Sequence, residues 1–386
     1  MKKSEWEAYC KGFYIVDCTI RHKNMAYVLM VQNEPPQSGE QEEWRYISWV
    51  PDILKSQNRT SAMANFYNLR PVPRVATQFK PVERSVLCDT GTFGWTGPNG
   101  GKENQPGLMH QMRTLWDEVY VLNSFSLSRR NGTTNEWEAL ALHPAILEDY
   151  NDEIPQRRYV LKDFDAFSPD TFYLMDTDGY IFYQSDDQWQ SIDLKEMGYP
   201  ELLTDGICCG PDGWVYVFAR DVDGAKIFQG REDQWKVIWT KHSEMFHVDF
   251  VAYQDYVILS NNLGRFKIKE GVVERFQAPV YGSLLSVRDN LLMVAGSDEA
   301  AIYDGEEWQV IISPRFNEEG EYQPLNVKLN RSGSALLEQL EYASSEQGKQ
   351  ELAEAKAEID QLDENALAEL QQRIHSAVKR AGKTKV

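Results

Sequence analysis

One short pattern recurs along this chain: an acidic or polar pair, a tryptophan, two further residues and then an apolar residue. The pattern is centred on Trp44, Trp137, Trp189, Trp235 and Trp308, and Val272 takes the tryptophan's place in one further copy. From position 137 on, the copies follow one another at 52, 46, 37 and 36 residues. Self-similarity at such a period indicates a repeat architecture, in which each unit buries its apolar face against the next.

The same order of short apolar runs precedes each copy. Tyr173–Met175 and Tyr180–Tyr183, for example, are separated by Asp178-Gly179 and lead to Trp189. β-Branched and aromatic runs joined by such dipeptides predict hairpins, because glycine accepts a positive φ at no steric cost. One more short run before each hairpin completes four strands per unit. We expect each tryptophan to pack between neighbouring units.

Trp44 and Trp137 are 93 residues apart, which leaves room for two units. Residues 72–98 are predicted to hold a degenerate unit. At the N-terminus, Ser4–Tyr9 also resembles the signature and could supply an outer strand that closes a ring against the last unit. The total is six clear units and one irregular unit.

Four short strands at this period resemble the blades of the β-propeller superfamily, similar in period to WD-repeat or kelch proteins. The resemblance covers about residues 5–313 and includes neither family's diagnostic dipeptides, so it transfers no functional residue. It implies a mainly β fold, a six- or seven-bladed β-propeller with a C-terminal α-helical tail. The predicted domains are a propeller over 1–313, a linker or closing segment over 314–333 and a helical tail over 334–386. The tail is predicted to be a helical pair that packs or dimerises, or alternatively a docking helix.

The formal net charge of the chain is −19, from 59 acidic and 40 basic residues. Residues 345–386 contain eight acids and seven bases, so residues 1–344 carry −18. Such a surface opposes the approach of nucleic acid and anionic membranes, and it favours a basic protein partner or simply solubility. Five cysteines without framework spacing, and no apolar stretch suited to a signal peptide or membrane span, predict a cytoplasmic protein with reduced thiols.

No catalytic motif or metal-ligand spacing stands out, and we predict no catalytic residues, no metal site and no cofactor. Asp176 and Asp178, like Asp221 and Asp223, begin like calcium loops but lack the bidentate glutamate, so turn chemistry explains them better. His110 and the run His247-Val248-Asp249 are expected on innermost strands, where some propeller hydrolases place metal ligands. Cys208 and Cys209, also innermost, are expected to be small buried hydrophobes.

Acidic residues gather at one predicted edge of the blades. The turn between the second and third strands lies on the same face as the connection between blades, and this face is the candidate partner-binding site. Its candidate residues are Asp176, Asp178, Asp221, Asp223, Asp298, Glu299, Glu148, Asp149, Tyr150 and Asp152. The opposite face also carries acids, at 186–187, 232–233 and 306–307, so charge alone does not choose the face.

These observations favour a non-catalytic protein-binding propeller. The sharper hypothesis is a bacterial immunity-type protein, or antitoxin, that neutralises a basic toxin or effector. One alternative is a metal-assisted hydrolase or lactonase with a site in the central channel. Another is an assembly scaffold that oligomerises through the helical tail.

Overall fold

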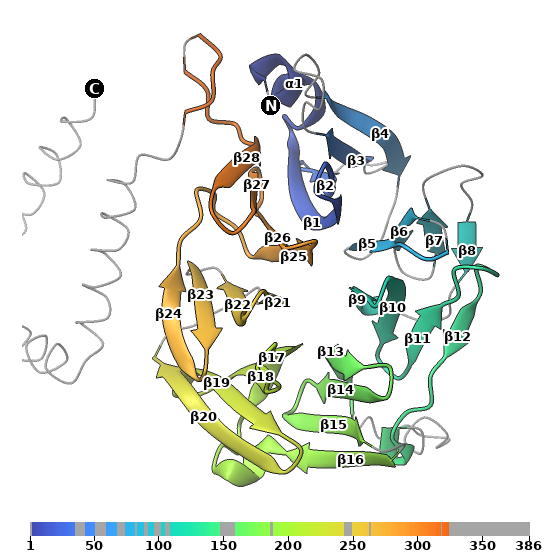
Figure 1. Cartoon of the computed structure of the whole chain (residues 1–386), viewed down its shortest axis with the longest axis vertical. Helices are drawn as coiled ribbons and strands as arrows, with labels where there is room; N and C mark the ends of the chain where they lie inside the picture. The colour runs from blue at the N-terminus through green and yellow to red at the C-terminus, as the bar shows by residue number, and fades with distance from the viewer. Residues whose placement is uncertain are drawn as a thin grey trace, which may run out of the picture. The chain divides into compact units, whose positions relative to one another are not determined.

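The computed structural model places the described strands in seven four-stranded sheets, arranged as blades around a central channel (Figure 1). It describes residues 2–34, 43–50, 59–67, 74–81, 83–88, 92–95, 102–104, 109–146, 159–185, 188–242, 249–261, 264–317 and 319–323. The chain divides into two compact units, 1–324 and 325–386. The predicted helical tail, 334–386, lies outside the described residues.

Each blade is a meander of four antiparallel strands, and the blades follow one another in chain order. Blade 1 has β1 (Phe13–His22), β2 (Met25–Gln32), β3 (Glu43–Val50) and β4 (Arg59–Tyr67), and blade 2 has β5 (Arg74–Gln78), β6 (Arg84–Cys88), β7 (Thr92–Trp95) and β8 (Lys102–Asn104). Blade 3 has β9 (Met109–Leu115), β10 (Glu118–Asn123), β11 (Leu127–Arg130) and β12 (Trp137–Ala139). Blade 4 has β13 (Leu161–Ser168), β14 (Thr171–Asp176), β15 (Tyr180–Ser185) and β16 (Gln188–Asp193), followed by a 3-10 turn, η1 (Leu194–Met197). Blade 5 has β17 (Leu203–Cys209), β18 (Val215–Asp221), β19 (Gly224–Arg231) and β20 (Gln234–Lys241). Blade 6 has β21 (Asp249–Tyr253), β22 (Tyr256–Asn261), β23 (Gly264–Lys269) and β24 (Val272–Phe276), and blade 7 has β25 (Leu284–Arg288), β26 (Leu291–Ala295), β27 (Ala300–Tyr303) and β28 (Trp308–Ile312).

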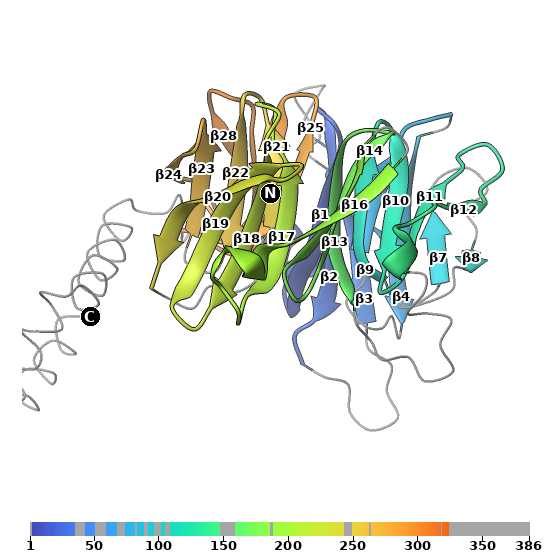
Figure 2. The same cartoon turned by 90° about the horizontal axis from the view of Figure 1, so that it is seen from below.

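The predicted propeller is therefore confirmed, with the larger of the two expected blade numbers. The degenerate unit expected over residues 72–98 is blade 2, whose strands are three to five residues long. The first strand of every blade lines the channel, and the strands run roughly along the axis of the ring (Figure 2).

Among the described residues the apolar core forms seven clusters, and each lies between two neighbouring blades. The cluster between blades 4 and 5, for example, joins Met175 and Ile181 to Val215 and Phe228. Isolated four-stranded sheets expose both faces, and stacking removes those faces from water.

The signature tryptophans pack at these blade-to-blade contacts, as predicted. Trp235 packs on the cluster between blades 4 and 5, and Trp308 stacks on Tyr303 with ring centroids 4.9 Å apart, near Phe276 of blade 6. Trp137, Trp189, Trp235 and Trp308 all lie on the outermost strand. Trp44 is different, because it lies on β3, the third strand of blade 1.

The expectation that Ser4–Tyr9 forms a closing strand is wrong. Lys3–Tyr9 forms a helix, α1, and blade 1 draws all four strands from residues 13–67. Trp6 of α1 packs against the cluster between blades 7 and 1 and faces Phe316, with ring centroids 6.4 Å apart. The ring thus closes by packing of a helix and a C-terminal segment, without exchange of a strand.

No helix among the described residues is both long and apolar enough to cross a membrane. Cys10, Cys18, Cys208 and Cys209 are buried and free. Cytoplasmic location stays a prediction.

Candidate functional site

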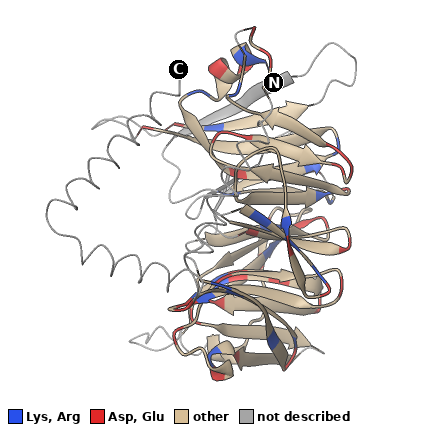
Figure 3. Cartoon of the chain, turned by 90° about the vertical axis from the view of Figure 1, so that its left-hand side faces the viewer, with Lys and Arg blue, Asp and Glu red and all other residues tan. Residues whose placement is uncertain are grey.

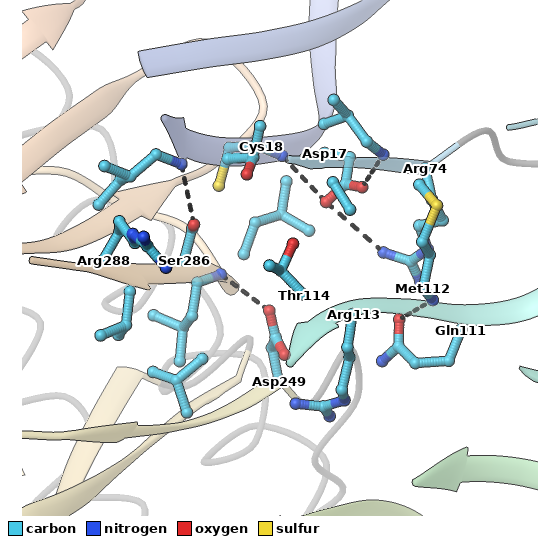
Figure 4. Close-up of a pocket in the computed structure, with 18 of the residues that line it drawn as sticks. Asp17, Cys18, Arg74, Gln111, Met112, Arg113, Thr114, Asp249, Ser286 and Arg288 are labelled. Atoms are coloured by element: carbon cyan, nitrogen blue, oxygen red, sulfur yellow. Dashed lines mark hydrogen bonds and ion pairs between the residues drawn. The ribbon is translucent and has the colours of Figure 1, made fainter. Parts of the chain in front are cut away.

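A polar cavity of about 450 Å³ lies in the central channel, between the first strands of the blades (Figure 4). Its acidic and basic lining residues are Asp17, Arg74, Arg113, Asp165, Asp249 and Arg288. The first strand of each blade is the inner edge of its sheet, so half of its backbone N–H and C=O groups lack a strand partner and face the channel. The side chains of the lining pair with these groups.

Four aspartates on innermost strands bind the backbone in the same way. In each, Oδ1 accepts the N–H of the following residue at 2.9 Å, and Oδ2 accepts an N–H from the innermost strand of the next blade. The cross-blade bonds run from Val75 to Asp17 at 2.7 Å, Ile207 to Asp163 at 3.0 Å, Cys209 to Asp165 at 2.8 Å and Leu285 to Asp249 at 2.8 Å. We call these four residues the inter-blade aspartates.

Bulges aim two of these side chains. In blades 1 and 4 the pairing of the first two strands skips a residue just before the aspartate, at Ile15/Asp17 and Leu161/Asp163. A bulge turns the strand locally and re-aims the next side chain. The carboxylates of Asp17 and Asp163 thereby reach the neighbouring blade.

Arg113 lies at the centre of the channel and links four blades. From β9 its Nη2 donates to both carboxylate oxygens of Asp163, at 3.1 and 3.0 Å. Nη1 also donates to the carbonyl of Phe250 at 3.3 Å, and Nη2 to that of Ile207 at 3.4 Å. A planar guanidinium suits this arrangement, because its donors spread in a fixed fork.

A second group of charges spans one end of the channel. Arg288 of blade 7 pairs with Asp117 of blade 3 at 2.7 Å, and Lys80 of blade 2 pairs with the same carboxylate at 2.7 Å. The Arg288 guanidinium also stacks 3.6 Å from the ring centroid of Phe79. These bonds link blades 2, 3 and 7 at this end of the channel.

Burial raises the pKa of three of the inter-blade aspartates. It raises the pKa of Asp17 to about 6, although Arg74 and the N–H groups of Val75 and Cys18 act in the opposite direction. Burial likewise raises the pKa of Asp165 and of Asp249, against the attraction of Arg113. Burial disfavours the charge on Arg113, but Asp163, Asp165 and Asp249 outweigh it and raise its pKa above the usual value.

The innermost histidine and cysteine candidates are dispersed. The Nε2 of His110 lies 2.7 Å from Ser124 Oγ, and partial burial of the ring together with Lys162 lowers its pKa. Cys208 and Cys209 are buried, and burial raises their thiol pKa well above the usual value. They fit the predicted role of small buried hydrophobes. Of the run 247–249, only Asp249 is described, and it lines the cavity.

The structure places the candidate partner-binding residues in two groups. Asp178, Asp223 and Asp298 are exposed in turns between second and third strands. Asp176, Asp221 and Glu299 are buried or nearly so. Glu148, Asp149, Tyr150 and Asp152 lie outside the described residues.

The carboxylates of the three buried candidates form hydrogen bonds and ion pairs within the propeller. Asp176 Oδ1 accepts the N–H groups of Asp178 and Tyr180, which is the turn chemistry expected there, and Asp221 pairs with buried Lys226 at 2.5 Å. Glu299 pairs with Arg315 and accepts a bond from Ser313 at 3.0 Å. These three carboxylates hold turns in place and offer little to a partner.

The opposite face carries more exposed carboxylates among the described residues. It holds the turns between first and second strands and between third and fourth strands. Its exposed acids in blades 4–7 include Asp170, Asp212, Glu232, Asp233, Glu270, Asp289, Asp304, Glu306 and Glu307. Figure 3 shows Asp and Glu in the turns at the ends of the blades.

The sequence analysis missed Asp17, Asp163, Asp165 and Arg113. A usable signal exists for the aspartates: each is followed by a small or apolar residue in a run that opens a blade, as in Asp163-Phe164-Asp165-Ala166. Arg113 has no comparable signal, because its partners come from strands 50 to 137 residues away.

Within the described residues, no group of three or more His, Cys, Asp or Glu side chains is arranged to hold a metal ion. The inter-blade aspartates instead bind backbone N–H groups. The hydrolase alternative therefore stays a prediction that no described cluster supports.

The main evidence for the fold is the topology of the sheets, because the comparisons with known proteins found only distant similarity. No protein-family model matches the sequence, and no curated protein matches it. Among solved structures, the chain is similar to YCF48 bound to a D1 peptide, with 13% identity over 78% of this chain and 82% of that one, at a TM-score of 0.40. It is also similar to YCF48 from Cyanidioschyzon merolae (13% identity, 61% and 83%, TM-score 0.42) and to a quinoprotein alcohol dehydrogenase-like protein from Bacteroides thetaiotaomicron (9%, 75% and 89%, 0.41). Likeness at this level carries no argument about function. The seven sheets themselves define the class: a β-propeller.

Proposed function

We propose that this propeller is a non-catalytic protein-binding module that recognises a basic partner. The observation that carries the proposal is the division of its charges. The ionisable groups of the channel hold blades together, whereas the exposed carboxylates lie in the turns on both faces of the blades. Blade turns on a rigid scaffold are where propellers of unrelated function place their contacts.

The finer form of the proposal is an immunity-type protein that neutralises a basic toxin or effector in the bacterial cytoplasm. The net charge of −18 over residues 1–344 supports it, because such a field accelerates encounter with a basic surface and makes the rate sensitive to salt. Asp178, Asp223 and Asp298 remain the proposed contact residues on one face. The exposed acids of the opposite face are the competing site.

The test starts from the full chain, used to capture proteins from its native cell at low and at high salt. The captured protein is then purified and its binding rates are measured at several salt concentrations. A basic partner whose association slows steeply with salt is expected. Association that is indifferent to salt, or the absence of any stable partner, contradicts the proposal.

Two triple variants decide between the faces. One carries Asp178→Asn, Asp223→Asn and Asp298→Asn, and the other carries Asp233→Asn, Asp289→Asn and Glu306→Gln. Each removes three exposed charges, so the long-range field falls equally in both. A loss of affinity confined to one variant identifies the face, and equal small losses in both would show that only the general field acts.

A further inference from the structure

Large apolar side chains are exposed mainly on one face of the propeller. This face carries the connections between blades and the turns between second and third strands, and we call it the connection face. Of the large apolar side chains that are exposed among the described residues, five lie on the connection face: Tyr14, Met197, Leu203, Val222 and Tyr281. The opposite face carries Trp116, Trp214 and Val272. Single exposed apolar residues are ordinary, whereas several on one face are typical of an interaction surface.

One group of these side chains lies where blades 4 and 5 meet. Leu203 is the first residue of β17, and Val222, which is 86% exposed, lies in the turn that follows the paired strand β18. The N–H of Thr204 donates to the carbonyl of the residue before Asp178 at 3.1 Å, so β17 begins beside this turn of blade 4. Leu203 and Val222 therefore lie between two exposed carboxylates, those of Asp178 and Asp223.

A second group lies where blades 7 and 1 meet, across the channel from the first (Figure 1). Its two tyrosines flank the turn between β26 and β27. The residue after Tyr14 donates its N–H to the carbonyl of Ser297 at 2.6 Å. Gly296 approaches the other tyrosine so closely that a Cβ on this glycine would lie 2.0 Å from the carbonyl oxygen of Tyr281. Asp298 is exposed in the same turn, so the two tyrosines border an acid.

The connection that carries Tyr281 is held firmly in place. Arg265 donates to the carbonyl oxygens on both sides of Tyr281, at 2.7 and 2.9 Å. Arg315 donates to the carbonyl of Pro279 at 2.9 Å. A side chain on an ordered connection loses less conformational freedom when a partner binds. Tyr281 is 61% exposed and aromatic, which are the properties of an interface anchor.

The apolar and acidic residues of the connection face occupy different zones. The first strand of each blade lines the channel, so Tyr14 and Leu203, near the beginnings of β1 and β17, border the end of the channel. The turns between second and third strands lie further out, and they carry Asp178, Asp223 and Asp298. Specific protein interfaces have a centre depleted of charge and a polar rim. The connection face has this arrangement.

We propose that a basic partner docks on the connection face, with apolar side chains over the end of the channel and lysine or arginine side chains against the acids of the rim. This inference rests on the proposed function and deepens it, because it chooses between the two faces. Charge complementarity selects the occupant. The formal net charge of the chain is −19, so a second copy meets repulsion, whereas a basic segment with apolar residues complements both zones.

The first experiment uses two short synthetic peptides that contain the same number of lysines. One also contains leucines, and the other has serines at those positions. Calorimetric titration of the full chain measures both. We expect saturable binding of the lysine–leucine peptide and binding of the lysine–serine peptide that is weaker by roughly tenfold or more, because only leucine gains from burial.

Val222→Ser is expected to weaken the binding of the lysine–leucine peptide by roughly threefold to tenfold. Its matched control is Val272→Ser, which changes the same residue type at a 58% exposed position on the opposite face and should leave the affinity unchanged. Tyr281→Ser tests the group across the channel and should weaken binding at least as much as Val222→Ser. All three side chains are exposed, so the variants are expected to fold.

The same variants are then tested with any basic protein that the full chain captures from its native cell. A captured partner that binds Val222→Ser and Tyr281→Ser as tightly as the natural chain overturns the docking surface and leaves the proposed function intact. Peptide binding that depends on Val222, without any captured partner, contradicts the proposed function and supports the surface.

The peptide titrations can also overturn the docking surface directly. Equal affinity for the two peptides, or no saturable binding of either, removes the apolar zone from recognition. An equal loss in Val222→Ser and Val272→Ser does not distinguish the faces and contradicts the choice made here. Light scattering adds one further outcome: self-association of the natural chain that Tyr281→Ser abolishes would assign the face to a second copy instead of a basic partner.

Discussion

The junctions between blades 4 and 5 and between blades 7 and 1 hold neighbouring blades by different chemistry. At the first, two carboxylates cross the gap, from Asp163 to Ile207 and from Asp165 to Cys209. At the second, the cross-blade acceptors are uncharged: Ile20 N–H donates to Ser286 Oγ at 3.0 Å and Ile15 N–H donates to the carbonyl of Ser297 at 2.6 Å, and α1 covers the outside. The carboxylate junction is strong but depends on ionisation and on Arg113, whereas the uncharged junction depends on packing.

The largest effect is expected where the carboxylate junction loses its cation. Arg113→Ala leaves Asp163 buried without a charged partner, which costs about 3–5 kcal/mol of unfolding free energy. Urea unfolding measures it. The control, Arg129→Ala, removes a half-exposed arginine that pairs with Glu118 and Glu138, and it should cost about 1 kcal/mol or less. Equal losses in the two variants would mean that Arg113 is not what holds the four blades together.

The second effect concerns the packing of the closing junction. Trp6→Ala removes a partly buried indole from the cluster between blades 7 and 1 and is expected to cost about 2 kcal/mol. Trp214→Ala is the comparison, because Trp214 is 36% exposed in a turn of blade 5. A loss for Trp6→Ala no greater than for Trp214→Ala would show that α1 does not secure the closure.

The third effect is a pH dependence of the free energy of unfolding that arises at the junction between blades 4 and 5. Asp176 lies beside Thr204 where blade 4 meets blade 5, its Oδ2 is buried without a hydrogen-bond partner, and burial raises its pKa to about 7. Because the folded pKa is raised, the carboxyl stabilises the fold when protonated, and that contribution is lost as the pH rises from about 4 to about 7. Asp176→Asn should therefore be more stable than the natural chain at pH 8, by about 1–2 kcal/mol, and nearly equal to it at pH 4.

Melting curves at pH 4, 6 and 8 check this expectation. Asp178→Asn, an exposed neighbour in the same turn, is the control and should leave the pH profile unchanged. A constant difference between Asp176→Asn and the natural chain at all three pH values would exclude ionisation as the cause.

The two junctions also explain how far the sequence alone predicts the molecule. The outer strands can be predicted from the sequence, because an acidic or polar pair, a tryptophan and an apolar residue lie within a few positions of one another at Trp137, Trp189, Trp235 and Trp308. Ring closure by α1 cannot be predicted in this way, since Ser4–Tyr9 carries the same residue types as a signature strand. Only the packing of Trp6 on Phe316 distinguishes this segment from such a strand. The contacts in the channel are the most difficult to predict, because Arg113 has partners in three other blades and no local sequence pattern indicates that these residues come into contact.

The smallest effect is expected at the hydroxyl of the closing junction. Ser286→Ala leaves the N–H of Ile20 without its cross-blade acceptor and is expected to cost about 1 kcal/mol, independent of pH because a serine does not titrate in this range. Ser283→Ala, a neighbouring serine on the same cavity lining, is the control and should cost less. The difference between the two serines should be the same at pH 5 and pH 8, as measured by urea unfolding. If it instead varied with pH, the closing junction would depend on ionisable groups as the junction of blades 4 and 5 does, and the division into carboxylate and uncharged junctions would fail.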